Sequence, residues 1–122
     1  NSNLGAVWIL FLNETGGVKS EYKINTSRFG NGSELSYGDN FGNAIANLGD
    51  LDGDGVQDIA VGVFNDDDGC PWWHDCNNGA VWILFLNESG GVKNEYKINE
   101  SAFGNKNELY RKGEKFGIAI SY

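Results

Sequence analysis

The 122-residue sequence contains no methionine, one proline, one histidine and two cysteines. No apolar run is longer than Ala6–Leu12, which is too short to cross a bilayer, so we expect no membrane insertion. The net charge of −8 argues against nucleic acid as a partner, because nucleic-acid binding needs a basic patch. The absence of methionine, even at position 1, indicates a mature product or an internal piece of a longer chain.

Basic residues are also missing from the middle of the chain. Between Phe29 and Val92 there is no lysine or arginine, whereas 11 of the 17 acidic residues lie there. Solvated surface charge is seldom segregated in this way, and packed carboxylates repel one another unless a cation lies among them. The charge pattern therefore indicates a bound cation in this region.

An internal repeat organises the sequence. The segment Gly5–Leu35 returns as Gly79–Leu109 with 25 of 31 residues identical, and residues 41–46 match residues 116–121 after one inserted residue. Identity at this level indicates recent duplication of one structural unit, of which the chain holds about one and two-thirds. The predicted parts are a partial unit at 1–35, a complete unit at 36–109 and the first strand of a further unit at 110–122.

Each unit is predicted to form four short antiparallel strands. Ala6–Leu12 and its copy are apolar at every position, so we expect this strand to be covered on both faces. A buried helix is the alternative, but seven residues between turn formers are too few. The strand after the Gly-Gly turn alternates apolar and polar residues, as a half-exposed strand does. The predicted strands are Ala6–Leu12, Val18–Ile24, Phe41–Leu48, Asp58–Phe64, Ala80–Leu86, Val92–Ile98 and Phe116–Tyr122.

The predicted fold is all-β, with one complete four-stranded sheet over Phe41–Ile98. The other sheet lacks its second strand and acidic loop, because the sequence stops where that loop would begin. Proteins seldom leave the edge of an apolar sheet bare. Either a longer parent chain supplies more repeats, or neighbouring copies complete each other's sheets by strand addition.

The strongest chemical signal is the nonapeptide Asp50–Asp58, with the sequence DLDGDGVQD. Side-chain oxygens recur at its first, third, fifth and ninth positions, and a valine carbonyl is available at the seventh. This density of oxygen ligands suits calcium, whereas magnesium prefers fewer protein ligands. An EF-hand would need a glutamate where Val61 stands, so the loop connects strands. A solvated Asp-Gly turn is the alternative. The predicted ligands are Asp50, Asp52, Asp54, Val56 and Asp58.

Phe41-Gly42, followed by NLGDLDGDGVQDIAVG at Asn47–Gly62, resembles the FG-GAP repeat. This repeat is the blade of integrin α-subunit β-propellers and of many bacterial and algal surface proteins. The resemblance implies a propeller-blade-like sheet and the same calcium ligands. Integrin propellers close with seven blades, so no closed propeller is possible within this chain. The usual Gly-Ala-Pro after the second strand is also replaced here, by Gly62-Val63-Phe64.

The loop that follows carries further candidate sites. Cys70 and Cys76 fit neither a CxxC redox pair nor a four-ligand zinc site, so we expect a disulfide and an oxidising, extracellular setting; a Cys2His site with His74 is the alternative. Trp72 and Trp73 between them either contact a sugar or protein ligand or cap the sheet. A second metal site or a plain solvated loop is expected at Asp66, Asp67 and Asp68.

Five N-x-[ST] sequons, more than chance would give, predict N-glycosylation. The alternative is that asparagine-rich turns match the pattern by accident. The candidate asparagines are Asn13, Asn25, Asn31, Asn87 and Asn99.

No nucleophile elbow, phosphate-binding glycine loop or cofactor fingerprint is present, so we expect no enzyme and no catalytic residue. The expected function is an extracellular, calcium-stabilised structural repeat that self-assembles head-to-tail into a filament or array. In that assembly Phe116–Tyr122 of one copy would meet strands Ala6–Leu12 and Val18–Ile24 of the next. The alternative is an adhesion or carbohydrate-binding module of a longer surface protein, with Trp72 and Trp73 facing the ligand.

Overall fold

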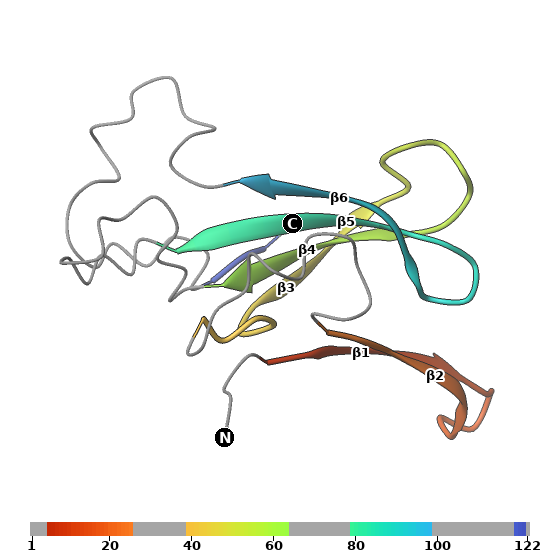
Figure 1. The fold of residues 1–122 in the computed structure, drawn as a ribbon. Helices are drawn as coiled ribbons and strands as arrows, with labels where there is room; N and C mark the ends of the chain where they lie inside the picture. The colour runs from red at the N-terminus through yellow and green to blue at the C-terminus, as the bar shows by residue number, and fades with distance from the viewer. Residues whose placement is uncertain (1–4, 26–38, 64–78, 99–118, 122) are drawn as a thin grey trace, which may run out of the picture.

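The computed structural model describes residues 5–25, 39–63, 79–98 and 119–121 (Figure 1). Within these ranges it contains strands and no helix. The described residues therefore include no helix that could cross a membrane. The strands are β1 (Val7–Leu12), β2 (Val18–Ile24), β3 (Ile45–Gly49), β4 (Asp58–Val63), β5 (Ala80–Leu86) and β6 (Val92–Ile98).

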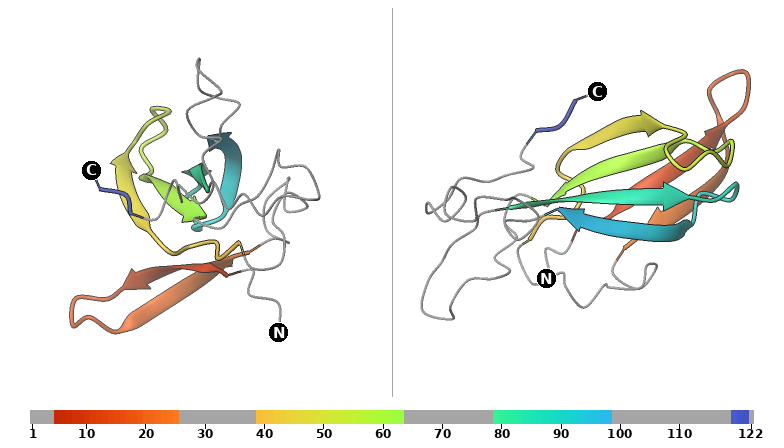
Figure 2. Two further views of the ribbon diagram at one scale, coloured as in Figure 1. Left: turned by 90° about the vertical axis from the view of Figure 1, so that its left-hand side faces the viewer. Right: turned by 90° about the horizontal axis from the view of Figure 1, so that it is seen from above.

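The strands form two antiparallel sheets. The first sheet has two strands in the order β1-β2, and the second has four strands in the order β3-β4-β5-β6. Figure 2 shows the first sheet as a separate layer beside the second. The all-β prediction is confirmed, with one complete four-stranded sheet and one incomplete sheet. The described residues form no closed barrel or propeller.

The duplicated hairpins β1-β2 and β5-β6 have the same register. Trp8 pairs with Lys23 in the first sheet, and Trp82 pairs with Lys97 in the second. Each lysine Nζ lies over the tryptophan ring, 5.5 and 5.6 Å from the ring centroid. The sequence duplication is therefore also a structural duplication, down to a cation–π pair.

The predicted bounds of β2, β5 and β6 are confirmed, and β1 begins one residue later than expected. The predicted start of β3 at Phe41 is wrong, because the strand begins at Ile45. Asn40 and Gly42 have φ angles of 59° and 92°, in the left-handed region, which a strand cannot contain. Phe41 is instead buried and forms an isolated parallel bridge with Gly5. A side chain at Gly5 would collide with the Phe41 carbonyl, since its Cβ would lie 2.0 Å from that oxygen.

Each duplicated hairpin has two faces, because side chains alternate across a strand. The tryptophan face carries Trp8, Leu10 and Leu12 in the first sheet, and Trp82, Leu84 and Leu86 in the second. The opposite tyrosine face carries Ile9, Tyr22 and Ile24 in the first sheet, and Ile83, Tyr96 and Ile98 in the second.

The main core lies between the tryptophan face of the second sheet and the tyrosine face of the first. It joins Trp82, Leu84 and Leu86 to Val7 and Ile24, and each of these side chains is at most 5% exposed. Burial of this apolar surface is the main force that holds the two layers together.

The prediction that Ala6–Leu12 is covered on both faces is wrong. Trp8, Leu10 and Leu12 are 54%, 51% and 57% exposed, whereas their copies in β5 are buried. An apolar strand is covered on both faces only if a layer packs on each side. The described residues supply such a layer for the tyrosine face of β1 and leave its tryptophan face open.

The predicted C-terminal strand is not formed by the residues that can be described. Residues 119–121 are not in a strand, and the rest of Phe116–Tyr122 lies outside the described ranges. Ile120 packs against Ala46, Ala60 and Val81 on the tyrosine-face side of the second sheet. Ile120 therefore covers part of that side, over β3, β4 and the start of β5.

The repeat provides a matched pair of variants that tests this packing. Trp82→Ala should lower the free energy of unfolding by about 3–5 kcal/mol, because it empties a fully buried site. Trp8→Ala should lower it by less than about 1 kcal/mol, because that side chain is half exposed. Urea denaturation of dilute protein measures both values, and equal losses would contradict the assigned core.

Candidate metal centre

The backbone of the loop between β3 and β4 folds around the carboxylate of Asp50. Asp50 Oδ1 accepts hydrogen bonds from the amides of Gly53 and Asp54 at 2.8 and 2.9 Å, and its Oδ2 accepts one from Gly55 at 2.8 Å. Gly53 and Gly55 have φ angles of 82° and 87°, which an L side chain would disfavour. The alternation of aspartate and glycine thus fixes the path of the backbone.

Asp58 ties this loop to the second sheet. Its side chain is fully buried, and its Oδ2 accepts a hydrogen bond of 2.8 Å from the Leu51 amide. Its Oδ1 accepts one of 3.0 Å from the Leu86 amide, at the end of β5. A buried carboxylate needs such donors, because desolvation otherwise makes its charge costly. Asp58 therefore has a structural role that the sequence pattern, which indicated only a ligand, did not reveal.

Three of the predicted ligands lie together. Carboxylate oxygens of Asp50, Asp52 and Asp58 are all within 4.8 Å of one another. Oxygens that share a calcium ion at its usual bond lengths lie at most about 5 Å apart, so this spacing fits. The cluster offers only hard oxygen donors, and these three side chains could hold a divalent cation.

Asp54 makes a different contact. Lys93 Nζ forms a hydrogen bond with Asp54 and lies 2.7 Å from Asp52 Oδ2. The Lys93 hydrogen bond, followed by the Val56 amide, lowers the pKa of Asp54, and hydrogen bonds to Asp52 and Asp54 raise the pKa of Lys93. The Val56 amide bonds Asp54 Oδ1 at 2.8 Å, while the Val56 carbonyl stays a predicted ligand.

Sequence reasoning missed Lys93, which lies one residue beyond the lysine-free window. The register of the sheet explains the position of Lys93. Leu86 pairs with Val92, and the Leu86 amide donates a hydrogen bond to Asp58. The start of β6 therefore lies at the same end of the sheet as the acidic loop. A search for basic residues next to the turn of the neighbouring hairpin could have found it.

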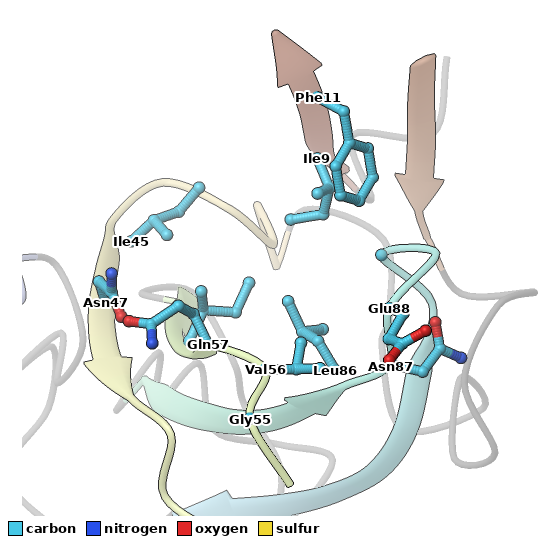
Figure 3. A pocket seen from close by; sticks show the side chains of 12 residues that line it. Ile9, Phe11, Ile45, Asn47, Gly55, Val56, Gln57, Leu86, Asn87 and Glu88 are labelled. Carbon is cyan, nitrogen blue, oxygen red and sulfur yellow. The ribbon is translucent and has the colours of Figure 1, made fainter. Parts of the chain in front are cut away.

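The other side of the loop borders an apolar cavity of about 500 Å³ between the two sheets. Figure 3 shows Val56 of the loop and Leu86 at the end of β5 pointing toward Ile9 and Phe11 of β1. The loop therefore separates two environments, with carboxylates and Lys93 on one side and apolar side chains on the other.

Other predicted sites are described only in part. The Asn13 and Asn87 side chains are exposed at equivalent hairpin turns, where each Oδ1 accepts bonds from the amide and hydroxyl two residues later. Asn25 directly follows β2. Glycosylation of these asparagines stays a prediction. The residues that lie outside the described ranges are Asn31, Asn99, Asp66, Asp67, Asp68, Cys70, Trp72, Trp73, His74 and Cys76.

Comparison with known proteins places this loop in a family. The FG-GAP repeat family model matches residues 41–84, from the bridge at Phe41 through the loop into β5. Residues 41–84 form an FG-GAP repeat.

Two curated relatives extend the match. Integrin alpha-5 of Xenopus laevis is 46% identical over 52 residues, which are 43% of this chain and 4% of that protein. Integrin alpha-4 of Xenopus laevis is 36% identical over 101 residues, which are 82% of this chain and 8% of that protein. The chain therefore spans less than a tenth of either relative.

Asp58 and Asp52 provide a second test. Asp58→Asn should cost about 1–3 kcal/mol in a chelating buffer, because an amide cannot accept both backbone hydrogen bonds and leaves a buried donor unpaired. Asp52→Asn should cost less than about 1 kcal/mol, because it loses only a solvent-exposed ion pair. Denaturation curves without metal measure both, and equal effects would refute the structural role of Asp58.

Proposed function

We propose that this chain is a calcium-stabilised structural repeat of an extracellular protein, in which FG-GAP blades stack on one another. The observation that carries the proposal is the group of three aspartates with oxygens within 4.8 Å, on a loop of an FG-GAP repeat. The loop joins β3 to β4, so a cation bound there would hold these two strands in their positions next to each other. This is a stabilising role and uses no reactive group.

Calcium is the cation that fits the donors best. Asp50, Asp52 and Asp58 are hard oxygen ligands, and the loop can add the Asp54 side chain and the Val56 carbonyl if Lys93 moves away. With all five, the site would approach the six to eight oxygens that calcium accepts, once water is added. Magnesium would need fewer protein ligands and a more regular geometry.

An extracellular location is supported by the similarity to two integrin alpha chains and by exposed sequons such as Asn13 and Asn87. The pair Cys70 and Cys76, which we propose to form a disulfide, agrees with an oxidising environment. We propose no catalytic activity, because the acidic residues that might serve it are accounted for by the loop.

The second candidate is an adhesion module of a longer cell-surface protein. It is favoured by the similarity to integrin alpha-4 over 82% of the chain, which amounts to only 8% of that relative. The two candidates share the calcium-bound blade and differ in what packs on it. In the first, blades of other copies do so, and in the second, further blades of the same chain.

Calcium should raise the melting temperature. At a free concentration 100-fold above Kd, binding to the folded state alone adds about 2.7 kcal/mol, which corresponds to roughly 10–20 °C for a domain of this size. Circular dichroism in calcium and in chelator measures the shift. Asp52→Asn should reduce it strongly, and an unchanged wild-type melting temperature would refute the assignment.

Lys93 should compete with the cation. Lys93→Gln should strengthen calcium binding roughly three- to tenfold, because no ammonium then has to leave Asp52 and Asp54. Titration calorimetry measures the two affinities. The matched control is Lys19→Gln, the equivalent position in β2, which should leave calcium affinity unchanged. Equal affinities for both variants would show that Lys93 does not compete.

A further inference from the structure

The duplicated hairpins allow the same residues to be compared in two environments. Trp82, Leu84 and Leu86 are 1%, 0% and 5% exposed, while the equivalent Trp8, Leu10 and Leu12 are 54%, 51% and 57% exposed. The strands have identical sequences over this face, so the difference comes from what lies against them. Among the described residues, the second sheet has a neighbour on its tryptophan face and the first sheet does not.

The neighbour of the second sheet is the tyrosine face of the first, and a glycine turn makes the close approach possible. A methyl group at Gly90 would lie 3.1 Å from Ile9 Cγ2, and 3.2 Å from both a ring carbon of Phe11 and the Cβ of Tyr22. Gly90 and Gly91 are buried in this contact. The turn of the second hairpin is therefore seated on three side chains of the first sheet.

The second sheet exposes residues of the tyrosine face that the first sheet buries. Tyr96 on the second sheet is 60% exposed, whereas its equivalent Tyr22 is partly buried. Ile98 is likewise partly exposed, whereas Ile24 is fully buried. Within the described part of the chain, the turn of the first hairpin has no such neighbour, since a methyl group at Gly16 would meet nothing within 4 Å.

We propose that a second copy of this chain docks its tryptophan face on the tyrosine face of the second sheet, repeating the contact within the chain. Leu10 of one copy would then lie against Tyr96 of the next, in the way that Leu84 and Tyr22 belong to one core cluster. The turn at Gly16 would be seated on Ile83, Phe85 and Tyr96. The inference rests on the proposed structural function and names the partner of that function.

A second copy is the occupant because the surface complementary to each open face is present on the same chain. The open tryptophan face has the same residues as Trp82, Leu84 and Leu86, which already pack on a tyrosine face of the same sequence. Any other partner would have to be complementary to one of these faces by coincidence.

The C-terminal residues cover part of the tyrosine face of the second sheet and leave Tyr96 exposed. Ile120 packs on Ala46, Ala60 and Val81, the last of which is the equivalent of Val7, whereas Tyr96 on β6 is 60% exposed. An incoming β1-β2 hairpin would therefore lie beside residues 119–121. Because the two faces differ, each added copy presents a new open face, and the contact builds rings or open filaments.

Two single substitutions and their mixture test the contact. Leu10→Lys blocks the tryptophan face, where the new lysine would pair with Glu21, and Tyr96→Lys blocks the tyrosine face. Both positions are more than half exposed, so both variants should fold, which circular dichroism checks. In calcium, light scattering after gel filtration should show concentration-dependent assemblies larger than a dimer for the wild type and a monomer for each variant. An equimolar mixture of the variants should stop at a one-to-one dimer.

A monomeric wild type overturns the inference. Loss of assembly in Leu10→Lys alone, with Tyr96→Lys unaffected, overturns it as well, because it indicates a symmetric contact. A wild type that stays monomeric while calcium raises its melting temperature leaves the proposed function standing. Assembly without any effect of calcium refutes the calcium role and not the docking faces.

Discussion

An entirely apolar strand exposes apolar surface to water unless a layer packs on each of its faces, and the stacking of the two sheets in this chain follows from that constraint. Every side chain of β5 is apolar apart from the indole N–H of Trp82, so backbone pairing with its neighbouring strands leaves the apolar side chains on both faces to be covered. Its tryptophan face is covered by the first sheet, and its other face is covered only in part, near Ile120. A single four-stranded sheet of this sequence cannot bury its own apolar surface, and stacking against another sheet is therefore part of its stability.

The acidic loop depends on the same sheet. Asp58 is a fully buried charge at the start of β4, and the amides of Leu51 and Leu86 compensate it. Two strands and the loop thus meet at one carboxylate, which fixes where Asp50 and Asp52 lie. Lys93 enters because β6 starts at this end of the sheet, and it offsets part of the negative charge. The order of the strands and the position of the candidate cation site therefore depend on each other.

The sequence predicted what depends on local pattern and missed what depends on three-dimensional register. Alternation, turn glycines and the repeat determined the bounds of β2, β5 and β6, and aspartate spacing identified three side chains that lie together. The early start assigned to β3 failed because Gly42, inside the predicted strand, has a left-handed conformation that the hydrophobic pattern does not reveal. Lys93 was missed because it meets Asp54 only through strand pairing, 39 residues away in sequence.

The exposure of β1 shows why composition alone cannot decide whether a strand is buried. β1 and β5 have the same residues from Val7 to Leu12 and their copies, so any rule based on sequence must give both the same answer. One tryptophan face is nevertheless in the core and the other in solvent. Burial is here a property of position within a stack, as in other repeat architectures where each unit contacts only its neighbours. Among the described residues, the first sheet exposes its tryptophan face and the second sheet exposes Tyr96 on its tyrosine face, so the two copies expose opposite faces.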